Sequence, residues 1–343
     1  MWHSTSRRQV LACAGAVALV ATSLAADSVD VVAGAHQPGI GTPPLPFLSI
    51  AAFDAVTGNR PGLVRLLQCL TGTVAALGSA RSTVTIGFGP SVFADDRFGV
   101  LARRPAALVP LPPFPGEALD PVQSDGDLCV QVCATTPIAA HEAIRTIVDA
   151  ARPYAKLRWR QTGFLPGTGG DPRGMLGFRD GTANISTSDA DAMARHVWVP
   201  DRASWMHGGT YLVVRRIRLL LDTWDRVDVA SQEGVIGRSQ RTNERLDTPA
   251  TAHVRLASPV VDTERILRRS YAYDAGADPN GLLDAGLIFI CFQRDPRHQF
   301  VPVQRRLAER DTLNAFCQHT ASAVFACPPA AAAGSWLGAG LFT

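Results

Sequence analysis

The sequence predicts an α+β fold built from two similar halves. Short apolar runs of strand length alternate with stretches in which apolar residues recur at helical spacing, and this alternation occurs twice along the chain. A glycine-rich loop region, Gly163 to Ser188, separates the two series. Hydrophobic residues make up 46% of the 343 residues and charged residues 18%, so the chain has enough apolar surface for a large buried core.

The first half places helices between strands. Pro61 and Pro137 each fit the first turn of a helix, where the N–H that proline lacks would have no partner. Leu157 and Trp159 alternate with basic residues, which is typical of a strand exposed on one face. The expected strands are 47–54, 84–88, 128–133 and about 156–160, and the expected helices begin near Pro61 and Pro137.

The second half repeats the alternation with a longer first strand. Residues 210–221 form one strand-like run, and Asp222 is placed to cap a short helix after it. The glycine-rich loop marks the boundary, so we predict a first half at 27–165 and a second half at 166–343. The later elements expected here are a strand at 286–293, a helix at 301–316 and a last strand at 322–325.

The first 26 residues have the pattern of an export leader. Arg7 and Arg8 precede an apolar run of Ala, Gly and Val, and Ser23-Leu24-Ala25 fits a cleavage site made of small residues. Paired arginines before a weakly hydrophobic stretch favour the twin-arginine route, which exports folded proteins. An ordinary secretory leader and a retained anchor are the alternatives, although a membrane span needs about 20 apolar residues. We therefore expect a periplasmic or extracellular protein with no stable membrane span after leader removal.

Composition excludes several other classes of function. The net charge is only +3, and no cluster of Lys and Arg is interleaved with aromatic residues, so nucleic-acid binding is not expected. Of the seven cysteines, Cys13 lies in the leader and the other six lie mostly in apolar runs. An exported protein can form disulfides, but this setting favours buried thiols. The sequence has neither zinc-ligand spacing nor the Cys-x-x-Cys-His motif of covalently bound haem.

Residues 177–184, Gly-Phe-Arg-Asp-Gly-Thr-Ala-Asn, are the most informative segment of the chain. They place the carboxylate of Asp180 and the guanidinium of Arg179 between glycines, which allow a sharp turn or a close approach to a ligand. From the residues alone, a solvated turn with a capping aspartate is an equal alternative.

In context, this segment resembles the distal-loop motif of DyP-type (dye-decolourising) haem peroxidases, and other segments resemble the exported, deferrochelatase-like subgroup in the same order. The resemblance covers essentially the whole chain after the leader. It implies two ferredoxin-like halves, each an antiparallel sheet with helices, and a haem in the C-terminal half. The further matching segments are Gly-Ala-His-Gln-Pro-Gly-Ile at 34–40, Asp-Leu-Cys-Val-Gln at 127–131, Ile-Gly-Arg-Ser at 236–239, His-Val-Arg-Leu-Ala at 253–257, Ile-Leu-Arg-Arg at 266–269 and Gly-Leu-Ile-Phe at 286–289.

The resemblance also implies an activity and a cofactor. The cofactor would be one non-covalent haem b per chain, with His253 as the iron ligand. Without the resemblance, the sequence around His253 favours a hydrogen-bonded core residue. Its second ring nitrogen needs an acceptor, for which we select Asp284. Asp180 would relay a proton between the peroxide oxygens, and Arg268 would stabilise the charge that develops; otherwise Arg268 would be a surface residue. Hydrogen peroxide would be reduced through an oxyferryl intermediate, and dyes, phenols or similar reductants would be oxidised.

Other haem contacts follow from the same resemblance. Gly181, Thr182 and Ala183 correspond to the stretch whose backbone covers the haem face. Ser258-Pro259-Val260 stands where exported members commonly have Asn-Pro-Arg, so an arginine able to face a propionate is missing. Arg238 would take over a propionate, and Phe289 would line the distal pocket unless it is a plain core residue.

Two other functions fit the same sequence. Some exported relatives resembling this chain are proposed to release iron from haem, and the same pocket would serve that function. The third candidate is an exported α+β binding module without a cofactor. As an assembly, a homodimer is compatible with the sequence.

Overall fold

The first half of the chain folds as a βαββαβ unit, the order of a ferredoxin-like domain. The computed structural model describes residues 35–78, 80–165, 173–179 and 183–343. The strands of this half lie in the order β2-β3-β1-β4, and all of their pairings are antiparallel. Its elements are β1 (Phe47–Ala55), α1 (Arg60–Leu77), β2 (Ser82–Phe88), β3 (Leu128–Ala134), α2 (Pro137–Ala151) and β4 (Ala155–Phe164).

The second half repeats this arrangement with more helices between its strands. The long strands lie in the order β9-β5-β8-β7, again antiparallel, and the short β6 pairs with β8. The elements are α3 (Ala190–His196), β5 (Thr210–Leu219), α4 (Leu221–Trp224), α5 (Val229–Ile236), α6 (His253–Ala257), β6 (Leu267–Arg268), β7 (Tyr271–Ala277), β8 (Leu283–Gln293), α7 (Phe300–Arg310) and β9 (Cys317–Cys327). The predicted α+β fold of two ferredoxin-like halves is confirmed.

The two half-sheets join at both edges and form one nine-stranded sheet. Phe88 of β2 pairs with Ala326 of β9, and Phe164 of β4 pairs with Ala272 of β7. A glycine precedes each junction. A Cβ on Gly163 would lie 2.7 Å from the Cβ of Tyr271, so a side chain at this position would push the half-sheets apart.

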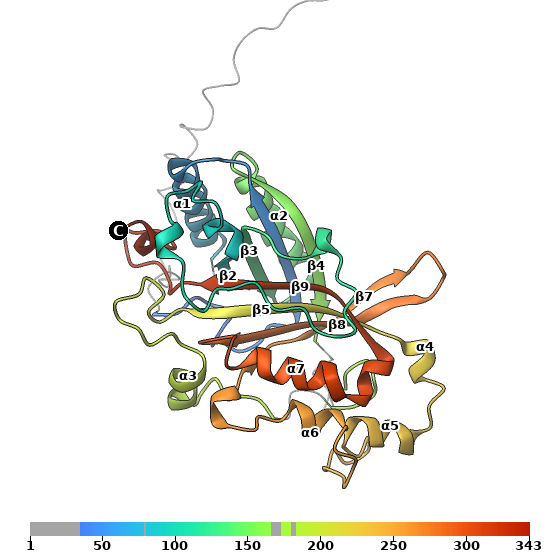
Figure 1. Cartoon of the computed structure of the whole chain (residues 1–343). Helices are drawn as coiled ribbons and strands as arrows, with labels where there is room; N and C mark the ends of the chain where they lie inside the picture. Colours follow the sequence, from blue (N-terminus) through green and yellow to red (C-terminus); the bar gives the residue numbers. More distant parts are fainter. Residues whose placement is uncertain (1–34, 79, 166–172, 180–182) are drawn as a thin grey trace, which may run out of the picture. The chain divides into compact units, whose positions relative to one another are not determined.

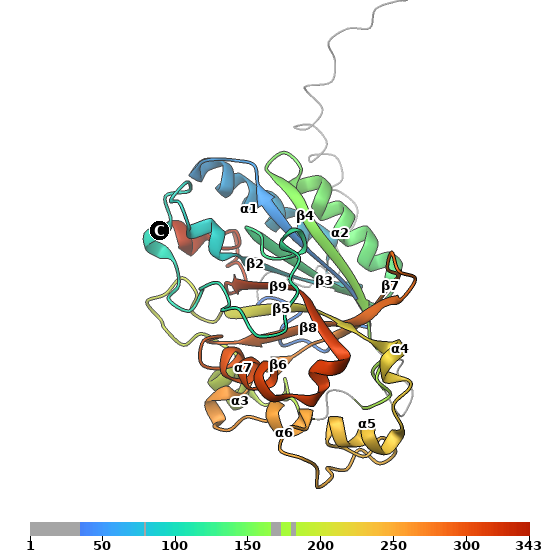
Figure 2. The ribbon, with the colours of Figure 1, turned by 45° about the vertical axis from the view of Figure 1, so that its right-hand side comes forward.

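The interior between the half-sheets is a hydrophobic core to which both contribute. Ile50 and Trp159 of the first half belong to the same buried cluster as Ile290 and Phe325 of the second. Helices cover the outer faces: α1 and α2 lie together beside the first half-sheet, whereas α4 to α7 lie beside the second (Figures 1 and 2). The second half therefore has a layer of short helices and loops over the outer face of its sheet.

Two expected details of this helical layer are wrong. The helix expected at 301–316 ends at Arg310, and a separate 3-10 helix, Thr312–Phe316, follows it. Asp311 causes the break, because its extended backbone leaves the α-helix and its side chain accepts a hydrogen bond from the N–H of Leu313. Asp222 does not cap the helix after β5 but lies inside it, and Leu220 occupies the cap position.

The cysteine prediction is confirmed. All six cysteines after the leader are free thiols, and four of them are fully buried. Among the residues that the structure describes, no helix combines the length and apolarity needed to cross a bilayer. The predicted leader at 1–26 lies outside the described residues.

Candidate functional site

His253 begins helix α6 and is held by a buried carboxylate. Its Nδ1 lies 2.6 Å from Oδ2 of Asp311, whose side chain is 3% exposed. The His253 side chain is 34% exposed, and its Nε2 makes no hydrogen bond with any residue that the structure describes. An imidazole fixed through one nitrogen, with the other nitrogen available, is the arrangement that metal-ligating histidines adopt.

Asp311 is itself fixed on both sides. Its backbone N–H donates to the carbonyl of Leu307 at the end of α7, and its Oδ1 accepts from the N–H of Leu313 at 2.9 Å. The break between α7 and the 3-10 helix thus aims one carboxylate oxygen at the protein backbone and the other at His253. The partner that orients the histidine lies 58 residues away in the chain.

The predicted pairing of His253 with Asp284 is wrong. Both carboxylate oxygens of Asp284 lie 2.8 Å from Nη2 of Arg216, and the hydroxyl of Tyr273 donates to Oδ1. Asp284 is near the start of β8, where the neighbouring strands β5 and β7 supply these two partners. Its carboxylate therefore belongs to a network at one end of the second half-sheet.

The glycine-rich segment and helix α6 pack against the same small hydrophobic cluster. Phe178 is buried there together with Trp224, and Val254, the neighbour of His253, packs against the cluster. The indole N–H of Trp224 also donates to the carbonyl of Leu176 at 3.1 Å. The start of the predicted distal loop and the predicted iron-ligand helix are thereby held by a common core.

The other end of the glycine-rich segment is hydrogen-bonded to Arg268. The Asn184 side chain accepts from the Arg268 N–H at 2.9 Å and donates to the Arg268 carbonyl at 2.7 Å. The guanidinium of Arg268 donates to the carbonyl of Ala183 at 3.1 Å. Asp180, Gly181 and Thr182 lie outside the described residues, but both flanks of this loop are placed: one beside the His253 helix and one at Arg268.

Three arginines form a cationic cluster at this site. Burial lowers the pKa of Arg238, and so do the charges of Arg245 and Arg268. Arg238 and Arg245 face each other across an isolated antiparallel bridge. Among the described residues, no carboxylate forms an ion pair with any of the three arginines. Cations that share a site are suited to an anionic ligand.

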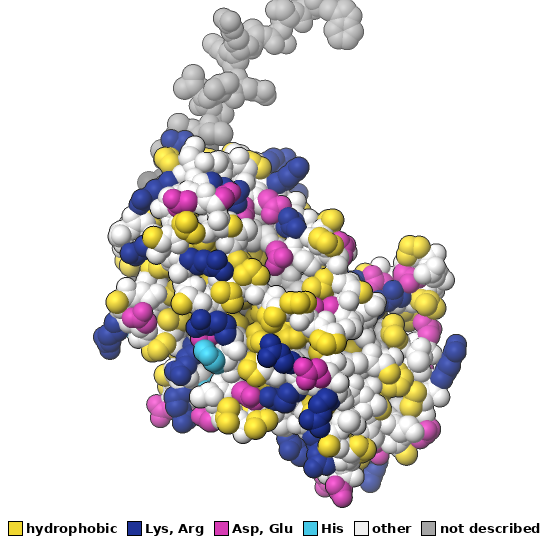
Figure 3. Space-filling model, in the orientation of Figure 1, with side chains coloured by type: hydrophobic (Ala, Val, Ile, Leu, Met, Phe, Trp, Pro, Cys, Tyr) yellow, Lys and Arg dark blue, Asp and Glu magenta, His cyan; other side chains and the backbone are white. Residues whose placement is uncertain are grey.

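The segment after α6 is held by the hydroxyl of Ser258 and the backbone N–H of Val260, and not by the Val260 side chain. The Ser258 hydroxyl donates to the Val254 carbonyl at 2.6 Å, and the Val260 N–H donates to Oε2 of Glu264 at 2.9 Å. The side chain of Val260 itself points to solvent, since the residue is 73% exposed. Glu264 also forms a two-bond ion pair with Arg306 of α7. On the face drawn in Figure 3, Lys and Arg side chains gather over α6 and α7.

Replacing Glu264 by glutamine should lower the free energy of unfolding at pH 7 by about 1–3 kcal/mol, because hydrogen bonds between charged groups are lost. Burial raises the pKa of Glu264, but hydrogen bonds from Arg306 and from the Val260 N–H outweigh it and hold the pKa below its ordinary value of 4.5. The stabilisation is therefore present above about pH 4.5 and disappears as the pH falls through the lowered value. Denaturant unfolding at several pH values measures it.

Asp262, in the same turn, provides the control for Glu264. Its side chain is 63% exposed and lies 3.7 Å from Arg265, so replacement by asparagine should change stability by less than about 1 kcal/mol. Equal losses for the two variants at pH 7, or a loss at Glu264 that does not diminish as the pH falls below 4.5, would contradict the assigned role.

Phe289 lies on β8 directly opposite Arg215 of β5. It is half-buried, packs against the outer core, and its ring lies 6.1 Å from the ring of Phe300 at the start of α7. Phe289 thus faces the helical layer, whereas Ile288 and Ile290 face the interior between the half-sheets. Its predicted position in a distal pocket stays a prediction.

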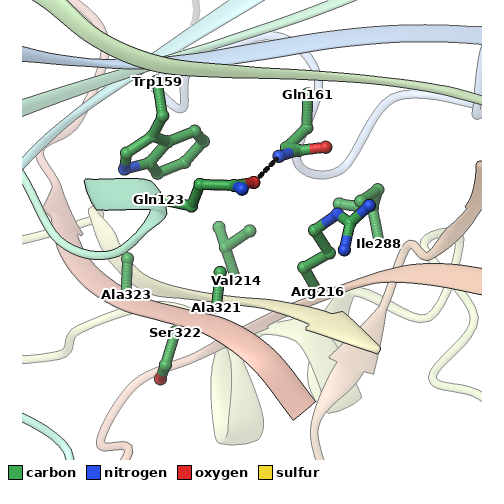
Figure 4. A pocket seen from close by; sticks show the side chains of 9 residues that line it. All are labelled: Gln123, Trp159, Gln161, Val214, Arg216, Ile288, Ala321, Ser322 and Ala323. Atoms are coloured by element: carbon green, nitrogen blue, oxygen red, sulfur yellow. Dashed lines mark hydrogen bonds between the residues drawn. The ribbon is translucent and has the colours of Figure 1, made fainter. Parts of the chain in front are cut away.

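A small cavity lies elsewhere, between the half-sheets. Trp159 and Gln161 of β4 face Arg216 of β5 across it, and Gln161 donates to Gln123 at 2.8 Å (Figure 4). None of the predicted site residues lines this cavity. The cluster around His253, Asp311 and Arg268 on the helical side is the candidate functional site.

Comparisons with known families match both halves of the chain. The family model of the Dyp-type peroxidase N-terminal domain matches residues 37–165, and that of the C-terminal domain matches residues 171–332. The second match contains residues 177–184, His253 and Asp311.

Curated relatives fall under two names. The dye-decolorizing peroxidase of Thermobifida fusca is 36% identical, and the match covers 92% of this chain and 85% of the relative. The deferrochelatase of Yersinia pestis is 32% identical, and the match covers 80% of this chain and 76% of the relative.

Solved structures show the same fold. Ferric DtpA from Streptomyces lividans superposes with a TM-score of 0.83 at 36% identity, covering 90% of this chain and 95% of that one. A variant of DypB from Rhodococcus jostii RHA1 in complex with heme superposes with a TM-score of 0.72 at 25% identity, covering 85% of this chain and 95% of that one.

Proposed function

The chain belongs to the Dyp-type peroxidase family, and on that premise we propose that it is an exported haem b peroxidase that oxidises dyes, phenols or similar reductants with hydrogen peroxide. The observation that supports this proposal most directly is the geometry of His253. Its Nδ1 is bound to buried Asp311, and its Nε2 remains available as a ligand. Arranged in this way, the imidazole can serve as the single protein ligand that haem iron needs on one face.

The residues present fit a haem in the second half of the chain. His253 would hold the iron, and Arg238 would pair with a propionate. When bound, the haem would supply the site of peroxide reduction and would accept single electrons from the reductants. Ser258, Pro259 and Val260 follow the ligand helix directly. We propose that these three residues contact the haem, as do Phe289 and the backbone of residues 181–183.

The protein groups on the peroxide face would move and stabilise charge. Asp180 would accept a proton from one peroxide oxygen and return it to the other, which leaves as water. Arg268 would favour the ionised form of Asp180 and stabilise negative charge on the departing oxygen. Two hydrogen bonds support this role: the Arg268 backbone N–H donates to Asn184, and the guanidinium donates to the Ala183 carbonyl, which holds it against the flank of the loop that contains Asp180.

A spectrum and a peroxide titration of the purified full chain test the proposed function. We expect a Soret band after expression with haem, and rapid dye oxidation that requires both haem and hydrogen peroxide. A protein that binds haem without peroxide-dependent oxidation would contradict the peroxidase proposal. A protein with no Soret band would contradict haem binding altogether.

Iron release from haem is the second candidate, favoured by the relatives named deferrochelatase. The haem-loaded protein should then yield free iron and intact protoporphyrin when incubated with an iron chelator. Release of iron without measurable dye oxidation would favour this function. Unchanged haem over many peroxidase turnovers would exclude it.

We also propose that the protein is exported to the periplasm or the extracellular medium. We propose that residues 1–26 form a twin-arginine leader and that 27–165 and 166–343 are the two domains. Export of the folded protein would allow haem to be inserted before translocation. Replacing Arg7 and Arg8 by lysine should keep the protein in the cytoplasm, as fractionation would detect.

Replacing Asp311 by asparagine should weaken haem retention or peroxidase activity by about 10- to 100-fold, because the partner of a ligating histidine sets its orientation and basicity. The same replacement at Asp284, which binds Arg216 instead, should leave the haem spectrum unchanged. Absorption spectra and haem-release rates of the two variants measure the effect. The reverse order of effects would restore Asp284 as the partner of His253.

A further inference from the structure

We propose that Arg245 binds a propionate of the haem and so replaces the arginine that is missing at position 260. This inference rests on the proposed haem binding. Val260 cannot contribute a positive charge, and its side chain points to solvent. A cation beside the end of this helix would therefore come from another part of the chain.

Arg245 is placed at the same segment by a direct contact. Its Nη2 donates to Oγ of Ser258 at 3.0 Å, and that hydroxyl in turn donates to the Val254 carbonyl. A serine hydroxyl can donate once and accept twice, so both bonds can exist together. Arg245 thus reaches the end of the helix that begins with His253, two residues before Val260.

The bridge to Arg238 places the two arginines on neighbouring backbone segments. Arg238 uses Nη1 to donate to the Asn243 carbonyl at 2.8 Å, which closes the loop between them. The remaining N–H groups of the Arg245 guanidinium make no hydrogen bond with a described residue. Both arginines therefore have donors left for a ligand.

The acidic residues of the loop are occupied elsewhere. Glu244 accepts a hydrogen bond from the Thr242 hydroxyl at 2.9 Å, and Asp247 lies 3.9 Å from Arg255. Like charges held close together cost free energy unless an anion compensates them. A carboxylate is the anion for which a guanidinium has matching geometry, and haem b carries two propionates on one edge.

The test compares haem with its dimethyl ester, in which both propionates are neutral. Each form is loaded into the wild type and into R245A, and release is followed by transfer to excess apomyoglobin. We expect R245A to release haem about 10-fold faster than the wild type, as expected for loss of an exposed hydrogen bond between charged groups. Release of the dimethyl ester should be equal for the two proteins.

Two further variants sharpen the test. Arg241 is exposed in the same loop and makes no hydrogen bond with a described residue, so R241A should release haem at the wild-type rate. Adding V260R to R245A should restore slow release, because it returns a cation to the end of the ligand helix.

The outcomes separate this inference from the proposed function. Haem release from R245A at the wild-type rate would overturn it, and so would equal acceleration of haem and dimethyl ester, which indicates a purely structural role. Failure of V260R to slow release would overturn the replacement of position 260. A wild type that takes up no haem would instead overturn the proposed function itself.

Discussion

Replacing His253 by alanine should abolish stable haem binding and peroxidase activity. The imidazole is the only described side chain that combines a buried acidic partner at 2.6 Å with a second nitrogen available to a ligand at this site. Without it, the iron loses its protein ligand, and the ferric spectrum should vanish or change its coordination type. Absorption spectroscopy of the variant after haem addition, together with dye oxidation, measures both effects.

Free imidazole and a second histidine provide the controls. Imidazole added to H253A should restore a ferric peroxidase spectrum if the variant is folded, because it can fill the space left by the side chain. His298 also contacts a carboxylate, with Nδ1 3.1 Å from Asp295, but its side chain is 73% exposed. H298A should keep haem and activity, and full activity of H253A would exclude its assignment as the iron ligand.

The strands were largely predictable because most of them face the core on at least one side. Continuous apolar runs marked β1, β3 and β8 within a few residues of their ends. The half-exposed β7 was missed, since its second part, Asp274–Ala277, is exposed and has no apolar alternation. A strand that is hydrogen-bonded but not buried leaves no hydrophobic pattern in the sequence.

Residues of the site that lie in local sequence motifs were predictable, whereas the residue that depends on a long-range contact was not. His253 and Arg268 lie in short segments that can be matched one at a time. Asp311 could not be identified in this way, because its role depends on a helix break and on a contact across 58 residues. Its position before Thr-Leu is a local cap pattern that would have marked the break, although not the contact with His253.

The arginine cluster of Arg238, Arg245 and Arg268 could not be predicted from the sequence pattern. The missing arginine at position 260 was visible, but nothing in the spacing connects Arg245 with Ser258. The antiparallel bridge between Arg238 and Arg245 creates that connection, because it folds the loop back toward the end of α6. Substitutions at a ligand site can thus be compensated from another segment.

Replacing Asp180 by asparagine should slow the reaction with hydrogen peroxide by at least ~10-fold, given that acid–base catalysis usually contributes 10²–10⁴-fold. An amide keeps the shape of the side chain but cannot take up and return a proton. Haem binding should be unchanged, because the proposed iron ligand is His253 and not Asp180. Stopped-flow mixing of the haem-loaded variant with hydrogen peroxide measures the rate.

The pH dependence identifies the group that transfers the proton. In the wild type the rate should fall at acidic pH, where the carboxylate becomes protonated and can no longer accept a proton, whereas D180N should show little such fall. Asp191 is exposed in the first turn of α3, and D191N should react like the wild type. If D180N reacted as fast as D191N, the proton would have to move through Arg268 or water. R268A would then be expected to lose more activity than D180N, because Arg268 would still be needed to stabilise the developing negative charge.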